Sequence, residues 1–309
     1  TTEIYTLSLH DALPIFVLLL ACTSLNGCGS TQSGVDLGTI LGAAAGSALP
    51  VPAGSLVKAG TALGKSFQDI TPEQEYYIGR AVAASVFSTY RPYSDEAANR
   101  YLNTLGQTLA QASDRPDTFG GYHFILLDSP EINAFAAPGG LILVTRGMVR
   151  LCKSEDELAA VLAHEIGHIQ GQHGLKSIKT SRLTSAFSIL AMEAAKNYTP
   201  SQLGQLTEAF EGSITDITST LMNNGYSREL EADADRAAAN ILRRVGYDPG
   251  ALQTMLAEMQ KQMKPGGAGF AKTHPQPADR IRQLGPTVGG PALSPPPRQK
   301  RFEGAMSKV

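Results

Sequence analysis

Apolar residues recur at helical spacing over most of the chain after residue 70. The clearest run begins where Ser154 is followed three residues later by Glu157, a capping signature for a helix start. Its apolar stripe consists of Leu158, Val161, Leu162, Ile166 and Ile169. Similar patterns predict helices near residues 71–90, 94–112, 178–197, 201–222, 231–245 and 249–262, and two short apolar runs, 122–127 and 141–145, are predicted strands. The pattern therefore predicts an α+β fold that is mainly helical and contains a small sheet.

Composition divides the chain into four parts. We expect a leader over residues 1–28, a Gly/Ala-rich tether over 29–70, a globular domain over 71–285 and a disordered tail rich in proline and glycine over 286–309. Glycines spaced four apart between residues 38 and 46 would also suit close helix packing against a membrane or a partner. Both interpretations of the tether remain open at this point.

The leader carries a candidate lipid attachment site. Residues 15–25 form an apolar run typical of a secretory signal, whereas residues 1–14 contain no Lys or Arg and are interpreted as foreign to the native start. Cys28 follows a small residue and precedes a polar tether, which resembles a bacterial lipobox; Cys22 is the rival position. If the leader is removed at Cys28 and that residue carries the lipid, only Cys152 remains as a free thiol, so no disulfide within the mature chain is expected.

Charge and hydropathy argue against a nucleic-acid-binding protein and against a transmembrane helix at residues 15–25. The formal net charge is -2 with the two signs interspersed, which argues against a nucleic-acid-binding surface. The apolar run at 15–25 is shorter than the ~20 residues that a transmembrane helix needs. With 309 residues, the chain has room for one domain of about 200 residues plus appendages.

The candidate chemistry lies on the helix that follows Ser154. The sequence His164-Glu165-Ile166-Gly167-His168 puts two imidazoles four residues apart, and therefore on one helix face, where both can bind one zinc ion. Glu165 is then placed beside the open metal position, where a carboxylate can take a proton from a zinc-bound water. The alternative is a buried amphipathic helix whose histidines only satisfy local hydrogen bonds.

A catalytic zinc site needs a third protein ligand. His173 would point about 180° away from His164 on a continuous helix, so we interpret it as a surface residue or as an outer partner of a ligand. Glu231 and Asp235 share a face of a later helix, where Glu231 could bind the metal and Asp235 could accept the free N–H of a ligand histidine. The alternative is that these acids only complement the positive end of the helix dipole.

Four motifs in one order resemble the HtpX and CAAX-prenyl-protease family of gluzincin metallopeptidases, especially its bacterial periplasmic lipoprotein branch. They are the His164 to His168 motif; Ser227, Arg228, Glu231, Ala234 and Asp235; the segment from Asn133 to Gly140; and Thr273-His274-Pro275 with Arg280-Ile281. The resemblance covers about residues 70 to 285. It implies a zincin-type domain with a small β-sheet beside the active-site cleft, with one Zn²⁺ per chain.

The resemblance also implies roles for individual residues. It assigns the third zinc position to Glu231 rather than Glu229, and it places the strand from Leu141 to Thr145 beside the cleft. The preceding segment supplies the expected substrate-binding residues, which are Asn133, Ala134, Phe135, Gly139 and Gly140. An edge strand there could bind an extended peptide through its main chain, although the pattern alone also fits an ordinary core strand.

The implied activity is hydrolysis of peptide bonds in misfolded or unassembled envelope proteins, with Glu165 as general base. The implied location is the bacterial periplasm, with a lipid anchor to the outer membrane. A chaperone-like binding lipoprotein whose zinc site rarely turns over is the rival. His274 is the fourth candidate at the metal, either as a resting lock on the fourth zinc position or as an oxyanion donor. No tandem repeat of ~34 residues is visible.

Overall fold

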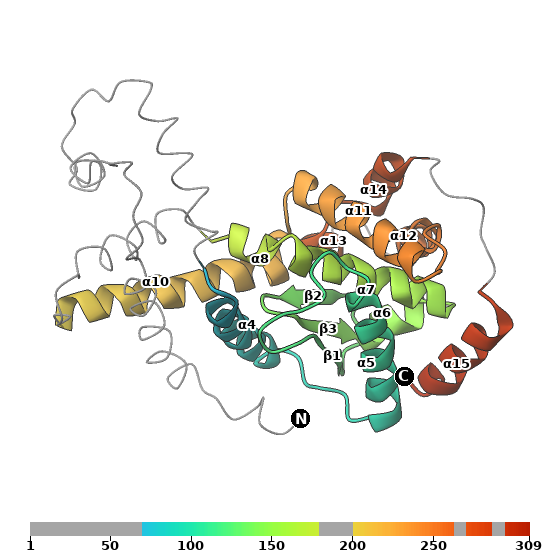
Figure 1. Cartoon of the computed structure of the whole chain (residues 1–309), viewed down its shortest axis with the longest axis horizontal. Helices are drawn as coiled ribbons and strands as arrows, with labels where there is room; N and C mark the ends of the chain where they lie inside the picture. The colour runs from blue at the N-terminus through green and yellow to red at the C-terminus, as the bar shows by residue number, and fades with distance from the viewer. Residues whose placement is uncertain (1–69, 179–199, 263–269, 286–293) are drawn as a thin grey trace, which may run out of the picture.

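The computed structural model describes residues 70–178, 200–262, 270–285 and 294–309 (Figure 1). The predicted leader with Cys28, the tether and the predicted helix at 178–197 lie outside these residues, apart from their last or first positions. Within the described ranges, no helix combines the length and the apolar composition needed to span a bilayer.

The sheet has three strands in the order β1-β3-β2. β1 (His123–Leu127) runs parallel to β3 (Leu141–Thr145), and β2 (Ala134–Ala137) runs antiparallel to β3. The strand at 141–145 is therefore the central strand, and β2 forms the edge. The expectation of an edge strand at 141–145 is wrong, because pairing with β1 on its other side uses the edge that a peptide would need.

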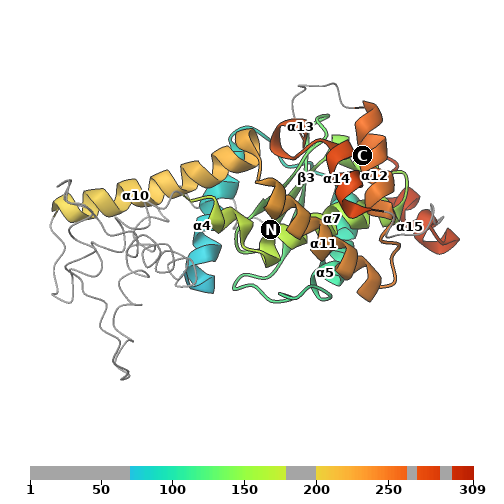
Figure 2. The same cartoon turned by 90° about the horizontal axis from the view of Figure 1, so that it is seen from above.

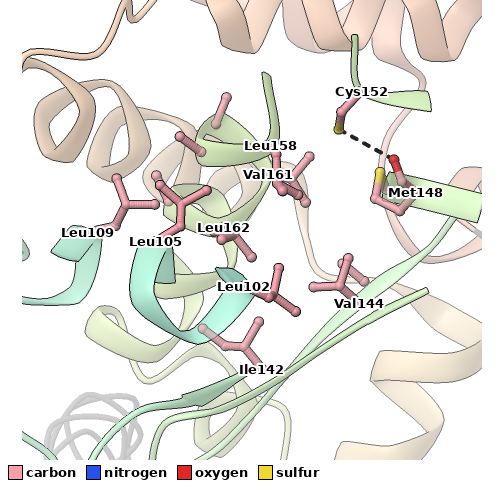
Figure 3. Close-up of a cluster of buried hydrophobic side chains, with 14 of the residues drawn as sticks. Leu102, Leu105, Leu109, Ile142, Val144, Met148, Cys152, Leu158, Val161 and Leu162 are labelled. Carbon is pink, nitrogen blue, oxygen red and sulfur yellow. Dashed lines mark hydrogen bonds between the residues drawn. The ribbon is translucent and has the colours of Figure 1, made fainter. Parts of the chain in front are cut away.

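Successive residues of each strand face two different cores, as the strand period of two requires. Ile142 and Val144 face one core with α5 (Glu96–Ala110) and α7 (Glu155–Gln170). Figure 3 shows this core, where leucines of α5 and α7 meet over β3. Leu141 and Leu143 face the second core, with α4 (Pro72–Phe87) and part of α10 (Pro200–Ser219). The sheet is thus covered by helices on both faces.

The β2–β3 turn lies directly against α4. Gly139 has φ +78°, a conformation that side chains disfavour, and its N–H donates to Oε1 of Glu75 at 3.2 Å. A Cβ on Gly79 of α4 would lie 1.7 Å from the carbonyl oxygen of Pro138. Glycine at both positions therefore allows the turn and the helix to touch backbone to backbone.

α7 is the central helix of the domain. It follows α6 (Arg146–Leu151) and is capped by Ser154, whose hydroxyl accepts the N–H of Glu157 at 3.2 Å. Every residue of α7 except Gln170 is buried. The chain then turns through Gln172, which has φ +51°, into the single turn α8 (His173–Lys176). The predicted helix start at Ser154 is confirmed.

The second half of the chain wraps around α7. α10 extends away from the body in both views (Figures 1 and 2) and runs into the π-helical turn η2 (Thr220–Asn224). α11 (Arg228–Arg244) is capped by Ser227 and packs along α7. α12 (Ala251–Gln262), the short α13 (Phe270–Thr273) and α14 (Pro277–Leu284) complete this half.

The chain from residue 294 onward is ordered, and α15 (Pro296–Met306) packs on the main core. Phe302, Met306 and Val309 lie on one face, at helical spacing, and all three are buried. Arg301 forms an ion pair with Glu155 at the first turn of α7. The prediction of a disordered tail is therefore wrong for residues 294–309, because this apolar face docks on the core; residues 286–293 lie outside the described chain.

Candidate metal centre

The two histidines of the α7 motif converge on one point. Their Nε2 atoms are 3.1 Å apart, and the side chains are 2% and 1% exposed. The four-residue spacing on a helix produces this arrangement. Burial lowers the pKa of His168 well below its usual value, and the neighbouring His164, His274, His173 and Arg280 add to the effect. His168 is therefore neutral near pH 7, which is the form that can bind a metal.

Glu231 approaches the same point from α11. Its Oε2 lies 3.6 Å from Nε2 of His164, and its Oε1 lies 3.6 Å from Nε2 of His168. Burial alone would raise the pKa of Glu231, but His274, His164 and Arg280 outweigh it and the pKa is lowered. Glu229, two residues earlier, is exposed. The helix register thus brings Glu231 and not Glu229 to the histidines.

Small residues allow α7 and α11 to approach each other here. A Cβ on Gly167 would lie 2.8 Å from the carbonyl oxygen of Ala234 and 3.1 Å from Cβ of Ala237. Gly167 is adjacent to His168 in the chain, and Ala234 is adjacent to Asp235. The close contact between the helices therefore lies next to the converging side chains.

His274 follows α13 and completes a group of four. Its Nδ1 lies 2.8 Å from Oε1 of Glu231, and its ring stacks on Phe270 with centroids 3.8 Å apart. One ligand atom from each of His164, His168, Glu231 and His274 can be chosen so that all four lie within 4.8 Å of one another.

The donor set fits a zinc ion. Tetrahedral ligands at zinc–nitrogen and zinc–oxygen distances of about 2.0 to 2.2 Å lie roughly 3.3 Å apart. The separations of 3.1 and 3.6 Å among His164, His168 and Glu231 bracket this value. Oε2 of Glu231 is buried without a hydrogen-bond partner among the described residues, which is costly unless a cation satisfies it. These residues are those that zinc prefers.

Glu165 lies beside this group. Its side chain is buried, and within the described chain Oε1 has no hydrogen-bond partner. Burial raises the pKa of Glu165, and the opposing effects of His164 and His274 do not cancel the increase. A carboxylate with a raised pKa is a stronger base, which suits a group that accepts and returns a proton.

A buried ion pair supports His164 from behind. Nδ1 of His164 lies 2.9 Å from Oδ1 of Asp235, and Arg280 from α14 donates two hydrogen bonds to the same carboxylate. Asp235 has a lowered pKa: burial opposes ionisation, but Arg280 and His164 outweigh it. The spacing on α11 predicts the role of Asp235. Arg280, 45 residues further on, is part of the downstream motif that includes His274, but the motif alone assigns it no role.

The other side of His168 contacts Tyr226 and His173. The Tyr226 ring stacks on His168 with centroids 4.3 Å apart, and Nδ1 of His173 lies 2.9 Å from Nδ1 of His168. His173 is fully buried, so its interpretation as a surface residue is wrong and the outer-partner alternative describes its place. The calculation of a 180° offset assumed a continuous helix, whereas the chain leaves the helix at Gly171 and Gln172.

The expected substrate-binding residues lie in several environments. Ala134 of β2 lies on the same sheet face as α7, whereas Phe135 points to the opposite core and packs near Tyr90, with ring centroids 5.4 Å apart. Asn133 uses its Oδ1 to accept the N–H of Ala134 at 3.0 Å. Gly139 and Gly140 form the turn against α4. The structure therefore does not bring these residues to one surface: Ala134 lies on the α7 side of the sheet, whereas Phe135 and the turn at Gly139 lie on the α4 side.

Comparison with known proteins gives consistent matches. Residues 96–288 match peptidase family M48. The chain is 26% identical over 218 residues to the beta-barrel assembly-enhancing protease of Escherichia coli (strain K12), covering 67% of this chain and 42% of that protein. It is 29% identical over 229 residues to the mitochondrial metalloendopeptidase OMA1 of Schizosaccharomyces pombe (71% and 63%), and 27% identical over 201 residues to the metalloprotease LoiP of Escherichia coli (64% and 73%). The chain thus spans less than half the length of the first of these relatives.

Proposed function

The chain belongs to peptidase family M48, and from this membership we propose that it is a zinc-dependent endopeptidase acting on misfolded or unassembled proteins of the cell envelope. The observation that carries the proposal is the convergence of His164, His168, Glu231 and His274 from three separate segments, with Glu165 beside them. A structural zinc site would be closed by its ligands and would have no use for an additional buried, unpartnered carboxylate.

We assign His164, His168 and Glu231 to hold one zinc ion, with Asp235 fixing the orientation of His164. A bound zinc ion supplies a Lewis acid and lowers the pKa of water toward neutrality. Glu165 takes the proton of the attacking water on its carboxylate and passes it to the nitrogen of the leaving amine. His274, whose ring stacks on Phe270, would either bind the zinc ion in a resting state or donate to the developing oxyanion.

The substrate would lie along β2, the edge of the sheet. Thr145 donates its N–H to the carbonyl of Asn133 at 3.1 Å, so Asn133, Phe135 and Ala137 direct their backbone groups toward β3. Ala134 and Ala136 therefore direct theirs outward. The N–H of Ala134 is already bound by Oδ1 of Asn133, so an extended peptide could pair with the carbonyl of Ala134 and with both backbone groups of Ala136. All four strand residues are at most 2% exposed, so the segment packed beside β2, which includes η2, must move aside first.

The cellular setting is part of the proposal. The relatives named as a beta-barrel assembly-enhancing protease and as LoiP are bacterial proteases, and the resemblance of the sequence at Cys28 to a lipobox supports a periplasmic enzyme anchored to the outer membrane. Polypeptide substrates of the envelope are the expected partners. Changing Cys28 to Ser behind a native leader should release the protein from membranes; continued retention would favour Cys22 or the glycine-rich segment.

The rival function, a chaperone-like binding lipoprotein, is not favoured because a binder would have no need of Glu165. The test is Glu165→Gln, which keeps the shape of the side chain but cannot accept a proton. It should keep one zinc per chain and lose at least about a hundredfold in the cleavage of fluorescent casein. Glu96→Gln, the same change at an exposed site, is the control. Activity of Glu165→Gln within tenfold of the wild type contradicts the proposal.

A further inference from the structure

We infer that His173 and Asp233 form a hydrogen-bonded relay that fixes the ring of His168 for metal binding. Nδ1 of His173 lies 2.9 Å from Nδ1 of His168, and Nε2 of His173 lies 3.2 Å from Oδ2 of Asp233. The inference rests on the proposed zinc site; it gives His173, one of whose two interpretations was an outer partner, a specific contact with His168, and it adds Asp233, which neither spacing nor resemblance placed there.

The direction of each hydrogen bond follows from the metal position. Nε2 of His168 faces the proposed zinc site and must present a lone pair, so its proton is on Nδ1. Nδ1 of His173 is then the acceptor, which leaves the proton of His173 on Nε2. That N–H donates to the carboxylate of Asp233. With both rings neutral, a single arrangement of protons therefore satisfies the hydrogen bond from His168 to His173 and the one from His173 to Asp233.

The backbone is shaped to bring His173 under His168. Gln172 has φ +51° and is the only residue other than glycine with a positive φ in the part of the chain that the structure describes. Side chains disfavour this conformation, and such outliers persist where the surrounding structure requires them. A Cβ on Gly171 would lie 2.2 Å from Nε2 of His173. Only glycine at 171 leaves room for the buried ring.

The two ligand histidines are thus supported in different ways. His164 donates directly to Asp235, a buried carboxylate that Arg280 also binds. His168 reaches a carboxylate only through the ring of His173, and Asp233 is 48% exposed and paired with Arg236 at 2.9 Å. A ligand histidine whose outer N–H is bound keeps its tautomer and its ring orientation, and loss of such a partner typically costs 10- to 100-fold in metal affinity.

Two matched substitutions separate the relay from simple filling of space. His173→Asn places Oδ1 where Nδ1 was, so it still accepts from His168; it loses Asp233, but an amide oxygen has no tautomer that Asp233 must fix. His173→Gln can still reach Asp233 but has no acceptor at the Nδ1 position. We expect a zinc dissociation constant, measured by competition with a chelator, within about threefold of wild type for His173→Asn and roughly 10- to 100-fold weaker for His173→Gln.

Two further measurements test the stability of the variants and the tautomers of the two histidines. Thermal unfolding of the zinc-free proteins should show similar losses for both variants, because both leave a similar cavity. In the zinc-loaded wild type, nitrogen NMR of the imidazoles should show His168 protonated on Nδ1 and His173 on Nε2. Equal zinc affinity for the two variants, or the opposite tautomer of His173, overturns the relay.

If a variant does not fold, Asp233→Ala at the exposed end should still weaken zinc binding severalfold, and an unchanged affinity overturns the role of Asp233. Failure of the wild type to bind zinc would instead remove the proposed function itself.

Discussion

Arg280 donates Nε to Oδ2 of Asp235 at 3.0 Å and Nη2 to Oδ1, and neither side chain is more than 4% exposed. The pair lies behind His164, so the stability of the fold and the geometry of the candidate metal centre depend on the same contact. Removing one member of a buried pair leaves an uncompensated charge, which is far more costly than losing a surface pair.

Arg280→Met should therefore lower the free energy of unfolding of the zinc-free protein by about 3 to 5 kcal/mol, measured by urea denaturation. Arg282→Met is the matched control, because Arg282 is 75% exposed and pairs with Asp279 on the surface. The control should change stability by less than about 1 kcal/mol. Equal changes in the free energy of unfolding for the two variants would show that the buried pair stabilises the fold no more than the surface pair does.

Glu231→Ala should strip zinc from the protein, because it removes a metal ligand, whereas Glu229→Ala should leave the metal content unchanged. Both positions lie in the first turn of α11, and only Glu231 is buried. Zinc per chain after dialysis against a weak chelator measures the difference. Loss of zinc in Glu229→Ala alone would mean that the register of the helix is misassigned.

His274→Ala distinguishes the two roles proposed for His274. If the imidazole occupies the fourth position as a resting lock, its removal should raise basal cleavage of casein; if it donates to the oxyanion, removal should lower cleavage by roughly a hundredfold. A zinc-bound structure should show a nitrogen of His274 about 2.1 Å from the metal in the locked state. An unchanged rate would leave His274 only a packing role against Phe270.

Phe302→Ala should lower the free energy of unfolding by about 3 kcal/mol, because it removes a buried ring from the face of α15 that packs on the core. Lys300→Ala, on the exposed side of the same helix, is the control and should change stability by less than about 0.5 kcal/mol. Urea denaturation measures both. If the two changes are equal, α15 does not contribute to the stability of the domain.

Residue spacing alone predicts the part of the candidate metal centre that lies on one helix. His164, Glu165 and His168 lie on a single capped helix, so their arrangement follows from the helical period alone. Residue spacing alone does not predict Glu231 as a metal ligand. Its spacing to Asp235 fits a helix-dipole role equally well, and only the resemblance selected it, because the packing of α11 on α7 is a contact between distant segments.

The errors share one cause. A prediction from helical spacing assumes that each element continues regularly, so it does not include the turn at Gln172 that buries His173. The proline and glycine content of the last residues likewise predicts disorder, whereas Phe302, Met306 and Val309 are buried against the core. In both cases tertiary burial determined a conformation that local composition does not specify.

Gly167 and Ala234 touch no metal, yet their contact sets how far apart α7 and α11 lie. A side chain at position 167 would meet the backbone of Ala234, push Glu231 away from His164 and His168, and enlarge the space that the three ligands share. No substitution at position 234 removes that contact, because the carbonyl group stays in place. In evolutionary terms, position 167 should therefore remain glycine among relatives, so that the size of ion the centre accepts is inherited through a residue outside it.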